Sequence, residues 1–266
     1  MIRKRIGIVY NWHSDIKYGP YLPIGPNGQK KQVYLVAIID DATRFIVHAA
    51  FYPMLDSRCV EDALRQAIMK QGVPEAVYFD NGKQFRNRWM KRTCSTLGIR
   101  LLYARPYSPE SKGKVERFNQ TVDGFLAEAA LEKPKDLNRL NDLFQVWLEE
   151  CYQLKTHAGL EDGKSPLEAF RGDAKPLRFA DMRLIADAFL HAETRKVDKS
   201  GCISFQDQKY EVGLAFIGCK VDVVYNPADL EELRIEYEGH EPFMVRKLII
   251  GERAGQRTDL PETLLP

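Results

Sequence analysis

Residues 33–52 read VYLVAIIDDATRFIVHAAFY, two apolar runs joined by a short polar turn. The first run, residues 33–39, is continuous and short enough for a buried strand. Asp40 and Asp41 open the turn, and residues 45–52 form the second run. This pattern predicts two neighbouring antiparallel strands inside a protein core.

The sequence on either side extends this pair into a mixed sheet. Residues 6–16 predict a strand, which a Gly- and Pro-rich turn over residues 19–28 connects to the pair. Downstream, the sequence predicts a helix from Asp56 or Ser57 to Gly72, a strand at 76–79, a helix at 85–97, a strand at 99–104 and a helix at 114–131. Three meander strands followed by strand–helix–strand crossovers predict an α/β fold: a mixed five-stranded sheet with helices on both faces.

The pattern changes in the last third of the chain. Helices are predicted at 137–151, 166–171 and 179–190, and short strands at close spacing follow them. Such strands are typical of a small all-β barrel. The predicted domains are a catalytic core at 1–173, a linker with a short helix at 174–192, a β-barrel at 193–255 and a tail at 256–266.

Composition excludes several classes of protein. No apolar run approaches 18 residues, which argues against a membrane span, and the N-terminus lacks the features of a signal peptide. Five cysteines without CxxC pairing and five histidines without HxxxH argue against zinc and disulfides and fit a reducing cytoplasm.

Basic charge is concentrated in one segment, although the net charge of the chain is only +2. Residues 83–117 hold ten Lys and Arg against two Asp and Glu. Aromatic residues interleave with them: Phe85, Trp89, Tyr103 and Tyr107. This surface suits a polyanion, and the alternative is a solvated basic face. Trp12, Trp89 and Trp147 are expected in the core.

Three carboxylates stand at positions suited to catalysis. Asp15 lies near the end of the first strand, Asp80 ends the fourth, and Glu116 lies in the first turn of the long helix. Clustered carboxylates without nearby His or Cys suit Mg²⁺ or Mn²⁺, and two such ions support phosphoryl transfer. Taken singly, such residues are more often turn formers or partners of a helix dipole.

Residues 12–170 closely resemble the catalytic core of retroviral integrases and bacterial DDE transposases. The matching segments are WHSDIKYGP, YLVAIIDDATRFIV, VYFDNGKQF, ARPYSPESKGKVERFNQTV and THAGLEDGKSPLEAF. Thirty-five residues separate Asp80 from Glu116, the spacing of the D,D-35-E subset. Asp40 and Asp41 compete with Asp15 for the first position, and we prefer Asp15 because it follows the family's Trp-x-x-Asp pattern.

This resemblance implies a ribonuclease-H-like fold in which Asp15, Asp80 and Glu116 bind two Mg²⁺ or Mn²⁺ ions. It implies metal-dependent 3′-end cleavage and strand transfer of a mobile DNA element. Residues 193–250 resemble the β-barrel that follows the core in Mu-type transposases, which implies a DNA-contacting or assembly domain. The alternatives are a ribonuclease-H-like nuclease without strand transfer and a non-catalytic DNA-binding or assembly protein.

The partners expected are DNA ends and target DNA, a second copy of the chain, and an accessory protein for target selection. Spacing along the long helix puts Lys112, Glu116, Asn119 and Gln120 on one face. The candidate DNA contacts near the site are Lys112, Lys114, Asn119 and Gln120, and the alternative is an ordinary exposed face. The sequence starts almost at the first core strand, so we expect either a fragment or a partner that recognises the element ends.

Overall fold

A computed structural model describes residues 11–104, 113–174, 176–227 and 229–248. The chain divides into two compact units, Met1–Phe189 and Leu190–Pro266.

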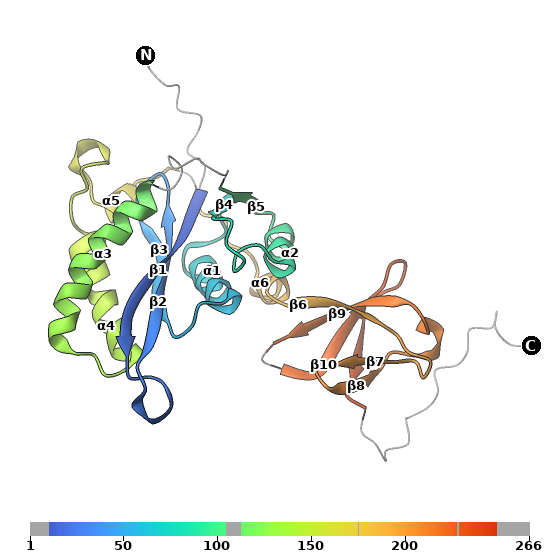
Figure 1. Cartoon of the computed structure of the whole chain (residues 1–266). Helices are drawn as coiled ribbons and strands as arrows, with labels where there is room; N and C mark the ends of the chain where they lie inside the picture. The colour runs from blue at the N-terminus through green and yellow to red at the C-terminus, as the bar shows by residue number, and fades with distance from the viewer. Residues whose placement is uncertain (1–10, 105–112, 175, 228, 249–266) are drawn as a thin grey trace, which may run out of the picture. The chain divides into compact units, whose positions relative to one another are not determined.

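The first unit is built on a five-stranded mixed sheet, as predicted. Its strands are β1 (Asn11–Leu22), β2 (Lys31–Asp40), β3 (Ile46–Tyr52), β4 (Ala76–Phe79) and β5 (Arg100–Tyr103). They lie in the order β3-β2-β1-β4-β5. The first three strands pair antiparallel, and β1 pairs parallel with β4, as β4 does with β5. β1 therefore lies at the centre, between the meander and the crossover strands (Figure 1).

Helices α1 (Ser57–Gln71) and α2 (Arg88–Thr96) cover one face of this sheet. Asp56 caps α1 by accepting hydrogen bonds from two main-chain N–H groups of the first turn. Gly72 ends the helix at φ +82°, a left-handed conformation that glycine adopts without strain. The short helices α5 (Pro166–Arg171) and α6 (Met182–Ala188) add Phe170 and Ile185 to the same apolar cluster.

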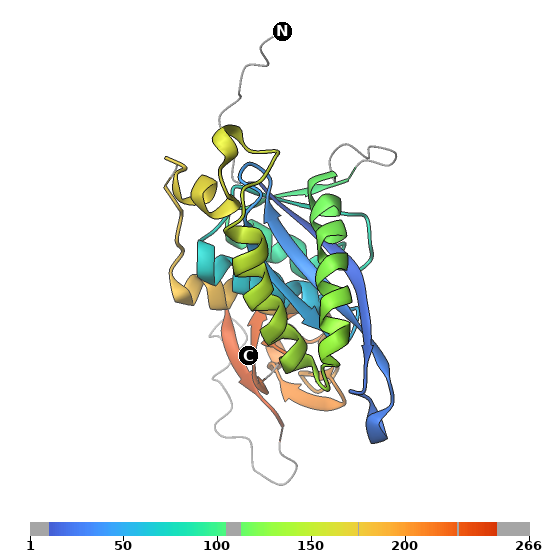
Figure 2. The same ribbon diagram turned by 90° about the vertical axis from the view of Figure 1, so that its left-hand side faces the viewer.

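Helices α3 (Gly113–Glu132) and α4 (Leu137–Trp147) cover the other face (Figure 2). The buried side of α3 consists of residues at helical spacing: Val115, Phe118, Val122, Phe125 and Ala129. Strand β2 alternates between the two clusters, because Val36 and Ile38 pack under α1 while Leu35 and Ala37 pack under α3 and α4. The odd positions of β2 thus face α3.

Side-chain amides cover the outer edge of β3. Asn141 both donates to and accepts from the Phe51 main chain, at 3.0 and 2.7 Å. Gln153 makes the same pair of bonds with Ile46, at 2.9 and 3.2 Å, and Gln145 donates to the Ala49 carbonyl at 2.7 Å. These amides satisfy main-chain groups that an edge strand otherwise leaves unpaired.

Two boundaries in the core unit differ most from the predicted ones. β1 continues to Leu22, through the predicted turn, because its pairing with β2 resumes after an irregularity between Tyr18 and Tyr21. The predicted helix at 137–151 ends as an α-helix at Trp147 and continues as a π-helical turn, Leu148–Gln153. That turn carries Gln153, whose side chain bonds the β3 edge.

The second unit is all-β, as predicted, and its described strands form two sheets rather than one closed barrel. One sheet has the order β11-β10-β9-β6, and β7 pairs only with β8. A bridge between Tyr210 and Lys247 links β8 to β11, while β6 pairs only with β9. Its strands are β6 (His191–Lys196), β7 (Cys202–Phe205), β8 (Gln208–Glu211), β9 (Lys220–Asn226), β10 (Asp229–Glu236) and β11 (Phe243–Arg246).

In the described part of this unit, the four-residue strands β7 and β8 pair with each other rather than with the four-stranded sheet. A shared apolar cluster, including Ile203, Val223 and Leu233, holds the hairpin against the sheet instead. Among the described helices of the chain, none has the length and apolar character needed to cross a membrane.

Candidate active site

Strand register places Asp15 and Asp80 at corresponding positions of neighbouring strands. The last parallel pair of β1 and β4 is His13 with Tyr78, whose rings stack with centroids 4.9 Å apart. Asp15 and Asp80 each follow two residues later, so they continue along the same face of the sheet. Strands in a sheet lie about 4.8 Å apart, which brings the two backbone positions close together.

The Asn-Gly turn after β4 holds the Asp80 carboxylate. Asp80 Oδ1 accepts a hydrogen bond from the Gly82 main-chain N–H at 2.7 Å. The Asn81 side chain donates to the Ala104 carbonyl at 2.7 Å, at the end of β5. The turn therefore connects the ends of β4 and β5 and fixes the position of Asp80.

Helix α3 lies over this same face. Asn119 Nδ2 donates to Asp15 Oδ2 at 2.8 Å, and Lys17 Nζ lies 2.8 Å from Asp123 Oδ1. Glu116, Asn119 and Asp123 are spaced three and four residues apart and share one stripe of the helix. Glu116 is therefore on the side of α3 that contacts β1, one turn before Asn119, and its side chain is exposed.

The first turn of α3 also contacts the β2–β3 turn. Lys114 Nζ donates to Asp41 Oδ2 at 2.5 Å and to the Asp41 carbonyl oxygen at 2.9 Å. His13 Nε2 lies 3.7 Å from the other Asp41 carboxylate oxygen. Lys114, predicted as a DNA contact, is thus ion-paired within the protein.

The two aspartates that competed with Asp15 have other local roles. Asp40 is fully buried and accepts hydrogen bonds from the Thr43 N–H at 2.9 Å and hydroxyl at 2.6 Å. Burial raises the pKa of the Asp40 carboxyl above its ordinary range, while the Thr43 bonds act in the opposite direction. Asp41 pairs with Lys114, and Asp15 alone of the three lies on the strand beside β4.

In the described residues, no three His, Cys, Asp or Glu side chains come close enough together to hold a metal ion. The carboxylates of Asp15 and Asp80 instead accept bonds from neutral amide N–H groups.

The donor chemistry at this position nevertheless fits a hard divalent cation. Asp15, Asp80 and Glu116 offer carboxylate oxygens, the ligands that Mg²⁺ and Mn²⁺ prefer. Beside Asp15, the Asn119 Oδ1 oxygen is buried and has no hydrogen-bond partner among the described residues. A buried polar oxygen without a partner is costly, so this atom is available for a cation or a water molecule.

Among the four predicted DNA contacts, Asn119 and Lys114 make contacts inside the protein. Gln120 is exposed on the next position of α3, and Lys112 lies outside the described residues. Asp41 and Asp123, which pair with Lys114 and Lys17, were not predicted from the sequence. For Asp123 a signal was present, because its i+7 spacing from Glu116 puts both residues on the same stripe of the helix.

A basic surface begins directly after Asp80. Residues 81–104 contain six Lys and Arg and no Asp or Glu. The exposed cations among them are Lys83, Arg86, Arg88, Lys91 and Arg100. Phe85 and Trp89 are buried in the core, so they do not belong to this surface. Tyr103 does contribute, since the Arg86 guanidinium lies over its ring at 4.9 Å.

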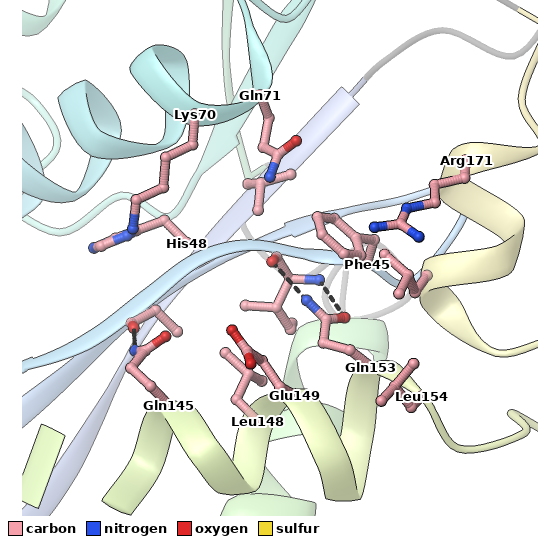
Figure 3. A pocket seen from close by; sticks show the side chains of 14 residues that line it. Phe45, His48, Lys70, Gln71, Gln145, Leu148, Glu149, Gln153, Leu154 and Arg171 are labelled. Carbon is pink, nitrogen blue, oxygen red and sulfur yellow. Dashed lines mark hydrogen bonds between the residues drawn. The ribbon is translucent and has the colours of Figure 1, made fainter. Parts of the chain in front are cut away.

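Several hollows lined by described residues of the first unit lie away from the three carboxylates. One, of about 380 Å³, opens at the β3 edge between Lys70, Glu149 and Arg171 (Figure 3). His48 lies in its wall, and burial lowers the pKa of this imidazole to about 4. None of Asp15, Asp80 and Glu116 lines it.

Comparison with known proteins gives two family matches. Residues 10–109 match the integrase core domain, and residues 186–245 match the Mu transposase C-terminal domain. The transposase for transposon Tn552 of Staphylococcus aureus is 25% identical over 254 residues, covering 85% of this chain and 51% of that protein. A putative transposase for insertion sequence element IS5376 of Geobacillus stearothermophilus is 28% identical, covering 64% of this chain and 42% of that protein.

A solved structure shares the fold. It is the simian T-cell lymphotropic virus intasome in complex with PP2A regulatory subunit B56 gamma, with a TM-score of 0.52 and 17% identity, covering 93% of this chain and 82% of that one. The chain spans about half, or less, of the length of the transposases it matches. The chain thus combines a match to the integrase core domain with a match to the Mu transposase C-terminal domain, and its similarity to transposases and to a retroviral intasome supports the resemblance to DDE transposases and integrases.

Proposed function

We propose that this chain performs metal-dependent 3′-end cleavage and strand transfer of a mobile DNA element. The observation that carries the proposal is the strand register: Asp15 lies on β1, Asp80 directly follows the neighbouring strand β4, and α3, the helix that includes Glu116, contacts Asp15 through Asn119. The family match supports the same reaction class, since integrases and transposases are polynucleotidyl transferases.

In this proposal Asp15, Asp80 and Glu116 hold two Mg²⁺ or Mn²⁺ ions. Bound there, the ions supply charge stabilisation and activation of a water or 3′-hydroxyl for in-line attack on a phosphodiester. The protein groups position the carboxylates: Asn119 orients Asp15 through one hydrogen bond, and the turn N–H of Gly82 orients Asp80.

The basic surface after Asp80 is proposed to bind DNA phosphates near the site, and Gln120 and Lys112 to add contacts from α3 and the segment before it. Exposed Lys and Arg attract a polyanion, and the attraction weakens with salt. The C-terminal unit fits assembly better than phosphate contact, because β10 carries Asp229, Glu231, Glu232 and Glu236. A homo-oligomer is proposed, since two DNA ends must be joined, with an accessory protein for target selection.

The test is strand transfer by the full chain, with a pre-cleaved labelled DNA end, a plasmid target and Mn²⁺. We expect joined products from the wild type and none from Asp80→Asn or Glu116→Gln, with DNA binding retained in both. Asp123→Asn is the matched control, because it removes a carboxylate from the same helix stripe without touching a proposed ligand, and it should stay active.

Three outcomes would count against this proposal. Nicked DNA without joined product favours the ribonuclease-H-like nuclease, which shares the fold and lacks strand transfer. Joined product from Asp80→Asn overturns the assignment of the site. DNA binding without any metal-dependent chemistry favours a non-catalytic binding or assembly protein.

A further inference from the structure

The β2–β3 turn is a fixed point beside the candidate site. The Asp41 N–H donates to the Asn11 carbonyl at 2.9 Å, which ties the turn to the start of β1. Arg44 closes the turn at φ +65°, with its N–H on the Asp40 carbonyl at 2.9 Å and its guanidinium on the Asp41 carbonyl. Tyr152 donates to the Arg44 carbonyl at 3.2 Å. A non-glycine residue at positive φ persists only where its surroundings hold it.

Lys114 joins the first turn of α3 to this fixed point. Its ammonium group makes two contacts with one residue, the carboxylate and the carbonyl oxygen of Asp41. The two side chains are 37% and 30% exposed, so water screens the pair only partly. A cation in the first turn of a helix interacts unfavourably with the positive end of the helix dipole. The Asp41 carboxylate offsets that cost.

Glu116 lies between two such contacts. Lys114, two residues earlier, is held by Asp41, and Asn119, three residues later, is held by Asp15. At 1.5 Å per residue these two contacts are about 7.5 Å apart along the helix. Helix ends open more readily than helix centres, so the Lys114 contact decides how firmly the turn with Glu116 stays on the sheet.

We propose that the Asp41–Lys114 ion pair is a positioning device for Glu116. It holds the first turn of α3 so that the Glu116 carboxylate stays within reach of Asp15 and Asp80. Asp41 and Lys114 act through Glu116 and touch neither DNA nor metal. The proposal rests on the proposed function, and it replaces the prediction that Lys114 contacts DNA.

The first measurement is hydrogen–deuterium exchange of the full chain without metal or DNA. Asp41→Asn and Lys114→Met should each speed exchange at least tenfold at the amides of residues 117–119, which donate to the carbonyls of the first turn of α3. The double variant should exchange no faster than the single ones, because either change already breaks the pair. Lys17→Met is the control, since it breaks the Lys17–Asp123 pair beyond Asn119 and should leave this turn unchanged.

The second measurement is strand transfer at varied DNA and Mn²⁺ concentrations. Both single variants should lower kcat about tenfold and raise the Mn²⁺ concentration for half-maximal rate, with KM for DNA unchanged. The exchanged pair, Asp41→Lys with Lys114→Asp, should restore both. A defect caused by general destabilisation would not be rescued by exchanging the charges.

The outcomes separate this proposal from the proposed function. Unchanged exchange in Asp41→Asn and Lys114→Met overturns the positioning role, whether or not the wild type is active. A raised KM for DNA in Lys114→Met alone, with Asp41→Asn like wild type, assigns Lys114 to phosphate contact instead. A wild type that makes no joined product overturns the proposed function, and the exchange experiment still decides the role of the pair.

Discussion

Replacing Asn119 by aspartate tests the geometry of the candidate site most directly. The variant exchanges the amide that donates to Asp15 at 2.8 Å for a second carboxylate. Loss of a hydrogen bond to a charged group costs about 1.5–3 kcal/mol. Two carboxylates about 4 Å apart repel by roughly 1 kcal/mol in water and roughly 4 kcal/mol near a protein surface. For this half-exposed position we expect a loss of about 2–4 kcal/mol in unfolding free energy at pH 8.

The loss of unfolding free energy in Asn119→Asp should increase as the pH rises. Repulsion raises the folded-state pKa of the carboxyl pair in the variant above the unfolded value of about 3.9. Below that value both states hold the proton, and a protonated carboxyl can donate to its neighbour. As the pH rises through the raised folded value the proton is lost, so the deficit against wild type should grow from pH 5 to pH 8.

Urea unfolding followed by tryptophan fluorescence measures this. Trp12, Trp89 and Trp147 are the three tryptophans of the chain, and all belong to the first unit, so the signal reports that unit. Gln120→Glu is the matched control, because it makes the same chemical change at the next, exposed position. Equal losses in the two variants, or a deficit that does not grow with pH, would refute the placement of Asn119 against Asp15.

Three further predictions concern the stability of the first unit away from the three carboxylates. Gln153→Met leaves both main-chain groups of Ile46 without partners in the core, and it should lower the free energy of unfolding by about 2–4 kcal/mol in urea. Gly72→Ala, at φ +82° with a main-chain oxygen 2.8 Å from the new Cβ, should destabilise more than Gly28→Ala, at φ +76° in open space; equal midpoints in thermal melts would contradict this. Burial lowers the pKa of His48 from 6.5 to about 4, so its unfolded form binds the proton first and stability should fall as the pH drops from 6.5 towards 4. Between pH 7 and pH 5, the unfolding free energy of His48→Gln in urea should fall by about 1 kcal/mol less than that of the wild type. This figure is discounted for the partial exposure of His48.

The sheet and its helices were predictable because local periodicity specifies them. The run at 33–39 is apolar throughout and becomes a strand buried on both faces, and the helical spacing from Val115 to Ala129 becomes the buried side of α3. The extent of β1 was not predictable from its Gly and Pro residues, because pairing with β2 outweighs their turn preference. The strand pairing of the second unit was not predictable for a similar reason, since short alternating strands do not determine which edges pair.

The order of Asp15, Asp80 and Glu116 along predicted strands and a helix is a property of the sequence alone, and so is the concentration of positive charge after Asp80. The partners of the polar groups around them are decided only by the tertiary structure. Lys114 meets Asp41 across 73 residues, and Asn119 meets Asp15 across 104. Periodicity places a residue on a face, but the partner of a charge depends on which element packs over that face, and that is settled when α3 docks on the sheet.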